Sequence, residues 1–151
     1  MKVIQVNQTE KHRASNEIKF IEKSVLKISK YLNAKKVRNK HLLKQKSEVM
    51  IVLLTPAQIK KINHQYRKKN RPTDILSFSG LEDSSFGELL LCPAVLKKQA
   101  KEHGHSLNAE TFYMLVHGIL HLLGYDHEKS KREERLMFRI QDQCFKTLGP
   151  V

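Results

Sequence analysis

The segment HGILHLLGYDH, residues 117–127, places three histidines at a spacing that can bind a metal ion. At about 100° per residue, His117 and His121 share one face of a helix, one turn apart, so both imidazoles can reach the same ion. Gly124 can end that helix in a left-handed cap and turn the chain back, which brings His127 to the same place. The pattern therefore predicts a metal site with His117, His121 and His127 as its ligands.

Three neutral histidines leave the fourth position of a tetrahedral Zn²⁺ open, which is typical of catalytic rather than structural zinc sites. The pKa of a water molecule in that position falls to about 7, and the ion can polarise a phosphoryl oxygen. Asp126 adjoins a ligand and is a candidate for orienting a histidine ring or accepting a proton. The remaining histidines have no comparable partners in the sequence and are interpreted as surface residues: His12, His41, His64, His103 and His105.

The spacing HxxxHxxGxxH is also that of metzincin proteases, which carry a glutamate directly after the first histidine as general base. This sequence has Gly118 at that position. Glycine can neither activate water nor protonate a leaving amine. The segment therefore predicts a metzincin-like zinc helix used for a reaction other than peptide cleavage.

The charge of the chain favours a polyanionic partner. Its 151 residues include 28 Lys and Arg against 15 Asp and Glu, a formal net charge of +13. Nucleic acid fits that charge better than the small or peptide substrates of another metallohydrolase. In the basic segment YRKKNRPTDILSF, residues 66–78, Arg67 is the candidate catalytic residue, because a guanidinium facing the metal could clamp a phosphate at two points.

The helices and strands predicted from the sequence indicate an α+β fold, in which about five helices pack on a small mixed sheet. These elements must position the candidate site residues. Hydrophobic periodicity and turn residues predict strands at 2–6, 49–54, 75–79 and 86–92. The same signals predict helices at 16–33, 56–66, 93–104, 108–124 and 130–148. Strands 75–79 and 86–92 are compatible with a hairpin. The apolar strand 49–54 is expected to be buried on both faces.

Other features of the sequence indicate where the protein works. The longest apolar run is far too short to span a bilayer, and the start of the chain lacks an apolar leader segment. Cys92 and Cys144 have no CxxC spacing, so two ordinary thiols in a cytosolic protein are expected, although sequence leaves a disulfide open. Segment 35–46 has six basic and no acidic residues, and is interpreted either as a solvated connection or as an RNA-facing edge.

Two motifs carry a resemblance to a known family. HGILHLLGYDH matches the HGxLHLxGYDH signature of the bacterial YbeY family of rRNA maturation endoribonucleases, and YRKKNRPTDILSF resembles that family's second motif. The order and separation of the motifs, with the length of the chain, extend the resemblance over nearly the whole sequence. By this resemblance His117, His121 and His127 match the family's metal ligands, with one Zn²⁺ per chain, and Arg67 matches an arginine implicated in activity.

The resemblance implies that residues 1–151 form a single metal-dependent endoribonuclease-like domain in the cytoplasm. It would cleave single-stranded RNA in 16S rRNA 3′-end maturation, small ribosomal subunit assembly and rRNA quality control. Its partners would be rRNA and the small subunit, with ribosomal proteins or an assembly GTPase as further candidates. The alternative is a non-catalytic rRNA-binding assembly factor with a metal-stabilised fold.

Two residues depart from the family pattern: Asn70 and Glu88 stand where the family often has aspartates. The sequence does not single out a general base. Asp126, Asp74, Glu88 and the substrate itself stay open as candidates.

Overall fold

A four-stranded mixed sheet forms the centre of the computed structural model, which describes residues 1–150 except 7–14, 46–47 and 83. The strands are β1 (Lys2–Val6), β2 (Glu48–Leu53), β3 (Ile75–Ser79) and β4 (Ser85–Leu91), in the order β1-β2-β4-β3. β2 runs parallel to β1 and β4, whereas β3 is antiparallel to β4. The predicted mixed sheet and its 75–92 hairpin are confirmed, and β3 lies at the sheet edge.

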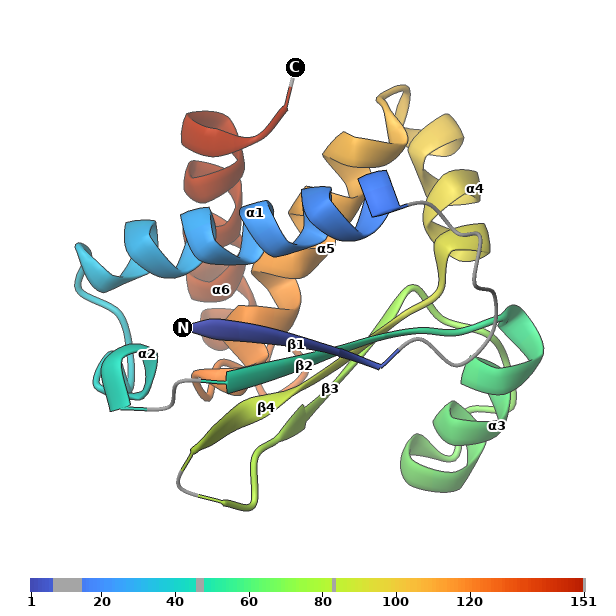
Figure 1. The fold of residues 1–151 in the computed structure, drawn as a ribbon, viewed down its shortest axis with the longest axis horizontal. Helices are drawn as coiled ribbons and strands as arrows, with labels where there is room; N and C mark the ends of the chain where they lie inside the picture. The colour runs from blue at the N-terminus through green and yellow to red at the C-terminus, as the bar shows by residue number, and fades with distance from the viewer. Residues whose placement is uncertain (7–14, 46–47, 83, 151) are drawn as a thin grey trace.

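All five predicted helices are present in the described residues. They are α1 (Ser15–Asn33), α3 (Pro56–Arg67), α4 (Pro93–His103), α5 (Leu107–Leu122) and α6 (Lys131–Leu148). A four-residue helix, α2 (Leu42–Gln45), is added within the basic segment 35–46. Figure 1 shows α1, α5 and α6 on one side of the sheet and α3 on the other. The α+β class is therefore confirmed.

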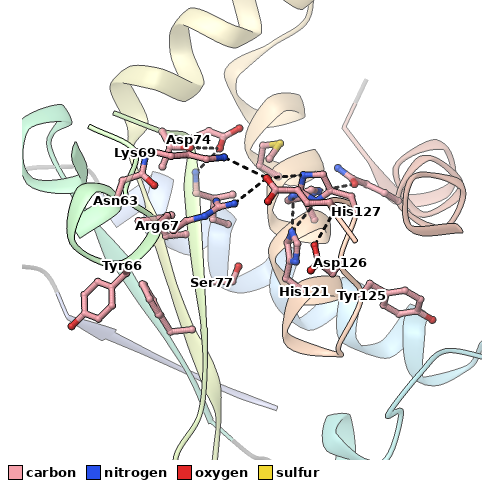
Figure 2. Close-up of a pocket in the computed structure, with 18 of the residues that line it drawn as sticks. Asn63, Tyr66, Arg67, Lys69, Asp74, Ser77, His121, Tyr125, Asp126 and His127 are labelled. Atoms are coloured by element: carbon pink, nitrogen blue, oxygen red, sulfur yellow. Dashed lines mark hydrogen bonds and ion pairs between the residues drawn. The ribbon is translucent and has the colours of Figure 1, made fainter. Parts of the chain in front are cut away.

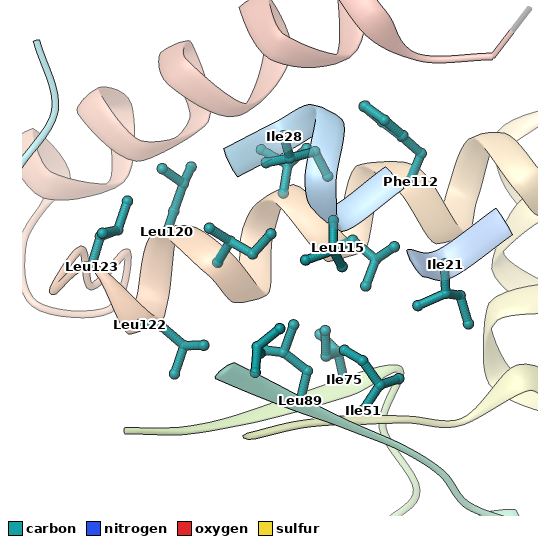
Figure 3. Close-up of a cluster of buried hydrophobic side chains, with 14 of the residues drawn as sticks. Ile21, Ile28, Ile51, Ile75, Leu89, Phe112, Leu115, Leu120, Leu122 and Leu123 are labelled. Atoms are coloured by element: carbon teal, nitrogen blue, oxygen red, sulfur yellow. The ribbon is translucent and has the colours of Figure 1, made fainter. Parts of the chain in front are cut away.

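Helix α5 lies at the centre of the core. It packs against α1, α4, α6 and β3, and most of its residues are buried, as expected for a helix that is apolar on most sides. Figure 3 shows Leu115 and Leu122 of α5 between the helices and the sheet side chains Ile75 and Leu89. Because α5 carries His117 and His121, the packed core fixes the positions of both imidazoles.

Gly118 marks the closest approach of α5 to the sheet. A Cβ atom built at this position would lie 2.8 Å from Ile75 Cδ1 and 2.9 Å from Leu89 Cδ2. Even a methyl group would therefore push buried side chains apart, and the larger side chain of glutamate would enter the core rather than the site. This packing gives a physical reason why the position is not the glutamate of a protease.

The expectation that strand 49–54 is buried on both faces is wrong at Met50, which is 36% exposed. Ile62 and Tyr66 of α3 border a hollow on this face of the sheet, where Met50 and Glu88 lie. Helix α3 thus covers only part of the face, and the strand itself ends at Leu53.

The two cysteines form no disulfide, and both are buried. Burial raises the pKa of the Cys144 thiol to about 12, so this sulfur stays protonated at neutral pH. This confirms the expectation of ordinary thiols. Among the helices of the described residues, none is long and apolar enough to cross a bilayer.

Candidate metal centre and its cleft

The three predicted histidines converge. The Nε2 atoms of His117 and His121 lie 3.1 Å apart, and His127 Nδ1 lies 3.2 Å from His121 Nε2. Zinc–nitrogen bonds of about 2.0–2.1 Å at tetrahedral angles require donor atoms about 3.3 Å apart. The three side chains therefore have the donor set and nearly the spacing that one zinc-sized ion needs, and they could hold such a metal.

Burial favours the neutral form of His117 and His121. It lowers the pKa of His121 to about 4 and also lowers the pKa of His117, with repulsion among the three rings as a further cause. A hydrogen bond to the backbone of Tyr125 opposes the shift at His121. Neutral imidazoles offer the lone pair that a metal needs, so these two side chains are suited to bind a cation near pH 7.

Gln141 of α6 orients the most buried ligand. Its Oε1 lies 3.0 Å from His117 Nδ1, and its Nε2 donates to the carbonyl of Tyr113 at 3.2 Å. The second bond fixes the amide so that His117 Nδ1 must be the donor, which leaves the lone pair of Nε2 facing the other histidines. Gln141 is completely buried, so water cannot replace it.

Replacing Gln141 with leucine should weaken metal binding about 10- to 100-fold, the usual effect of removing a partner that orients a histidine ligand. The His117 Nδ1–H group would be left buried without an acceptor. Zinc affinity, measured by competition with a chromogenic chelator, tests this expectation. Gln143→Leu is the matched control, because Gln143 is exposed on the same helix. Equal affinities for the two variants would contradict the role of Gln141.

The turn after α5 brings the third histidine to the site. Tyr125 N–H donates to the Leu120 carbonyl and Gly124 N–H to the His121 carbonyl, which together form a Schellman cap. Gly124 has φ +98°, a conformation that other residues rarely adopt. The left-handed glycine expected at the helix end is thus confirmed, and His127 follows it into the site.

Segment 35–46 supports this turn rather than acting only as a solvated connection. The Arg38 guanidinium makes two hydrogen bonds to the Glu133 carboxylate, at 2.6 and 3.1 Å, and donates to the Gly124 carbonyl at 3.1 Å. It also lies over the Tyr125 ring, 4.5 Å from its centroid. Neither interpretation of the segment anticipated this contact between α6 and the loop that carries His127.

A cleft of about 810 Å³ opens in front of the histidines. Its opposite wall is formed by the end of α3 and the basic loop that follows. Arg67 Nη2 and Lys69 Nζ reach the Glu128 carboxylate at 3.1 and 3.5 Å, and Glu128 lies beside His127. Figure 2 shows Arg67 and Lys69 pointing across the cleft toward His127. Arg67, Lys69 and the three imidazoles therefore share one cleft, which Arg71 also lines.

The position of the basic loop is set by α3. Lys68 ends the helix in a left-handed conformation, with φ 56°. The buried Asn63 donates from Nδ2 to the Arg71 carbonyl at 2.9 Å, and the Lys69 N–H bonds to the carbonyl of Asn63. These bonds hold the loop against the helix, so Lys69 is turned into the cleft and Lys68 is not among its lining residues.

The carboxylates that are candidates for the general base lie in two different hollows of the protein. Asp126 and Asp74 line the cleft, whereas Glu88 lies in the hollow beside α3. Asp126 Oδ1 accepts from the Glu128 N–H at 3.0 Å, and Asp74 Oδ1 accepts from the Ile75 N–H at 2.7 Å. The position of Glu88 argues against a part in proton transfer at the histidines.

His103 is exposed and His105 is partly exposed, but the expectation that they have no partners is wrong. Both rings contact the carboxylate of Glu110, which is buried. His41 and His64 are exposed, as expected, and His12 lies outside the described residues. No sequence pattern links Glu110 to these histidines, because the three residues belong to two helices and the turn between them.

Comparisons with known proteins agree with these motifs. The family model described as Endoribonuclease YbeY matches residues 5–149. "Endoribonuclease YbeY" of Bdellovibrio bacteriovorus is 45% identical over 148 residues, which cover 98% of this chain and 95% of that protein. The protein of the same name from Persephonella marina is 39% identical over 136 residues, or 86% of this chain and 82% of that protein.

A solved structure is also similar. The solution structure of TM1509 from Thermotoga maritima has a TM-score of 0.61 and 28% sequence identity, and the match covers 96% of this chain and 87% of that chain. The family model, both relatives and the solved structure each cover most of this chain. The chain therefore belongs to the Endoribonuclease YbeY family.

Proposed function

We propose that this protein is a metal-dependent endoribonuclease that binds one Zn²⁺ per chain through His117, His121 and His127. The observation that carries the proposal is the position of Arg67 and Lys69 across the cleft from the three histidines. An anionic group that reached the histidines would be within reach of both cations. The relatives named Endoribonuclease YbeY support the choice of RNA as the substrate.

The residues of the cleft would have separate roles in the reaction. A divalent ion at the histidines would supply a Lewis acid for a phosphoryl oxygen and an activated water for hydrolysis. Arg67 would bind the scissile phosphate through two N–H groups and stabilise the charge that develops on it. Lys69 would contact a neighbouring phosphate. Asp126 and Asp74 are the cleft carboxylates available to accept a proton.

Membership of the family supports a proposal for the biological setting. We propose that residues 1–151 work as one domain in the cytoplasm, in 16S rRNA 3′-end maturation, small-subunit assembly and rRNA quality control. The partners would be rRNA and the small ribosomal subunit, with ribosomal proteins or an assembly GTPase in addition. The net charge of +13 suits a polyanionic RNA surface of this kind.

Tyr66 offers a platform for an RNA base at the rim of the cleft. Its side chain is 63% exposed and meets Phe78 edge-on, with ring centroids 5.3 Å apart. Replacing Tyr66 with alanine should weaken the binding of single-stranded RNA by about 1–3 kcal/mol, the value of one stacked base. Tyr66→Phe keeps the ring and should bind normally in the same fluorescence anisotropy titration. Equal losses in both variants would exclude stacking.

Glu128 competes with RNA for the two cations. Burial would raise the pKa of its carboxyl, but the charges of Arg67 and Lys69 outweigh burial and lower it, so Glu128 is ionised at neutral pH. Glu128→Gln should tighten RNA binding about two- to fivefold, since an exposed ion pair is worth about 0.2–1 kcal/mol. Glu134→Gln removes the same charge from an exposed position on α6. A gain no larger than that of this control would contradict the competition.

The proposed function is tested with a fragment of precursor 16S rRNA that spans the 3′ end of the mature molecule. Metal-loaded protein should bind and cut this RNA, and chelated protein should bind without cutting. If loaded protein binds the RNA and never cuts it, the alternative of a non-catalytic assembly factor replaces the proposal. Equal cutting by both samples would contradict the metal dependence if folded His121→Ala protein, prepared in the same way, does not cut. Equal cutting by all three samples would indicate a contaminating ribonuclease.

A further inference from the structure

A second group of metal-binding side chains lies at the corner between α4 and α5. His103 Nδ1 lies 2.9 Å from Glu110 Oε2, and His105 Nε2 contacts the same oxygen. The donor atoms of the three residues lie within 4.8 Å of one another. Glu110 precedes His117 by seven residues on α5, about 10 Å along the helix axis. The group is therefore separate from the three-histidine site.

The burial of the Glu110 carboxylate needs an explanation. Its side chain is only 1% exposed. Both imidazoles contact Oε2, while Oε1 is buried and has no hydrogen-bond partner among the described residues. A buried carboxylate is costly unless it is paired or binds a metal. Histidine contacts to one oxygen satisfy only half of this group, whereas a dication between the rings would compensate its whole charge.

The local backbone directs the two rings to the same point. Gly104 caps α4 with φ +69° and reverses the chain between the histidines, and Ser106 starts α5 by accepting the Ala109 N–H. His103 is the last residue of α4, where the partial negative charge of the helix end favours a cation. The outer side of the group is open, since the His103 side chain is 56% exposed, so an ion could enter from solvent.

We propose that His103, His105 and Glu110 form a second binding site for a divalent transition-metal ion, with zinc as the ligand that best suits its donor set. Two imidazole nitrogens and one carboxylate oxygen suit Zn²⁺, Ni²⁺ or Cu²⁺ better than Mg²⁺ or Ca²⁺, which prefer oxygen ligands alone. The bound ion ties the end of α4 to the first turn of α5. Its role is to stabilise the helix that carries His117 and His121, and the inference does not depend on RNA cleavage.

The test uses the His121→Ala protein, in which the three-histidine site is broken. After excess metal is removed, the zinc that stays bound to the protein is measured by elemental analysis. In a separate experiment Co²⁺ is added, and its visible absorption spectrum is recorded. We expect one equivalent of zinc in this variant, a Co²⁺ spectrum, and a higher melting temperature with zinc than with Mg²⁺. Adding His103→Ala should remove all three signals.

Two variants keep the result interpretable. His103→Ala leaves His105 to pair with Glu110, so the fold should survive, which circular dichroism checks. His64→Ala, in place of His103→Ala, removes an exposed histidine of α3 and should change none of the three signals. The proposal is overturned if His121→Ala protein binds no zinc, or if it binds the same amount with and without His103.

Discussion

His121→Ala should lower the rate of RNA cleavage at least about a thousandfold. A metal ion supplies several kcal/mol of charge stabilisation to a phosphoryl transition state, and each 1.36 kcal/mol is a factor of ten. The substitution removes the central donor, whose Nε2 lies within 3.2 Å of nitrogens of both other histidines. The rate is measured under single-turnover conditions with excess zinc.

His64→Ala serves as the control for this experiment, because it removes an exposed histidine from α3 without touching the cleft. It should cut RNA at the wild-type rate. RNA binding by His121→Ala should fall far less than cleavage, since Arg67 and Lys69 are intact. If folded His121→Ala protein retained wild-type cleavage, the histidines would have no part in the chemistry.

Arg67→Ala should lower the rate constant of cleavage about 10²–10³-fold, the usual cost of removing one group that stabilises a developing charge. Arg67→Lys should recover only part of the rate, because an ammonium group keeps the charge but cannot hold a phosphate at two points. Zinc affinity should stay unchanged in both variants, since Arg67 contacts Glu128 and none of the ligands directly. Single-turnover rates and metal content distinguish these effects.

Lys68→Ala is the matched control for Arg67, since it removes a neighbouring positive charge from a residue outside the cleft lining. Its effect should be limited to a small, salt-dependent loss of affinity. If Arg67→Ala and Lys68→Ala reduced binding alike and neither changed the rate of cutting, Arg67 would be one more surface cation. That outcome would favour an RNA-binding factor without catalysis.

The parts of the molecule that local patterns determine could be predicted from the sequence. Helix α3 begins at Pro56, as predicted, and Thr55 caps it in a capping box completed by Gln58. Ser130 likewise accepts the Glu133 N–H, but the Glu133 carboxylate pairs with Arg38 instead of completing the box. The histidine spacing predicted that the three histidines converge, because this depends on one helix and the glycine that ends it.

Contacts between distant segments were not predictable in the same way. Arg38 and Glu133 are far apart in the sequence, and Glu110 meets two histidines across a helix corner. The sequence does mark Gln141 as unusual. It is a polar residue between Met137 and Cys144 on the apolar stripe of α6, which is the buried face of that helix. A polar residue in such a stripe needs a buried partner, but the sequence does not say that the partner is His117.

The most direct test of the account is a zinc titration of metal-free wild-type protein, in which the rate of RNA cleavage and the zinc bound are measured at each step. His121→Ala protein is titrated in parallel, so that zinc bound outside the three-histidine site is known. We predict no cleavage without metal, a rate that rises in proportion to occupancy of the three-histidine site, and no cleavage by His121→Ala at any zinc concentration. Cleavage by the metal-free protein at the rate of the loaded protein would contradict the account.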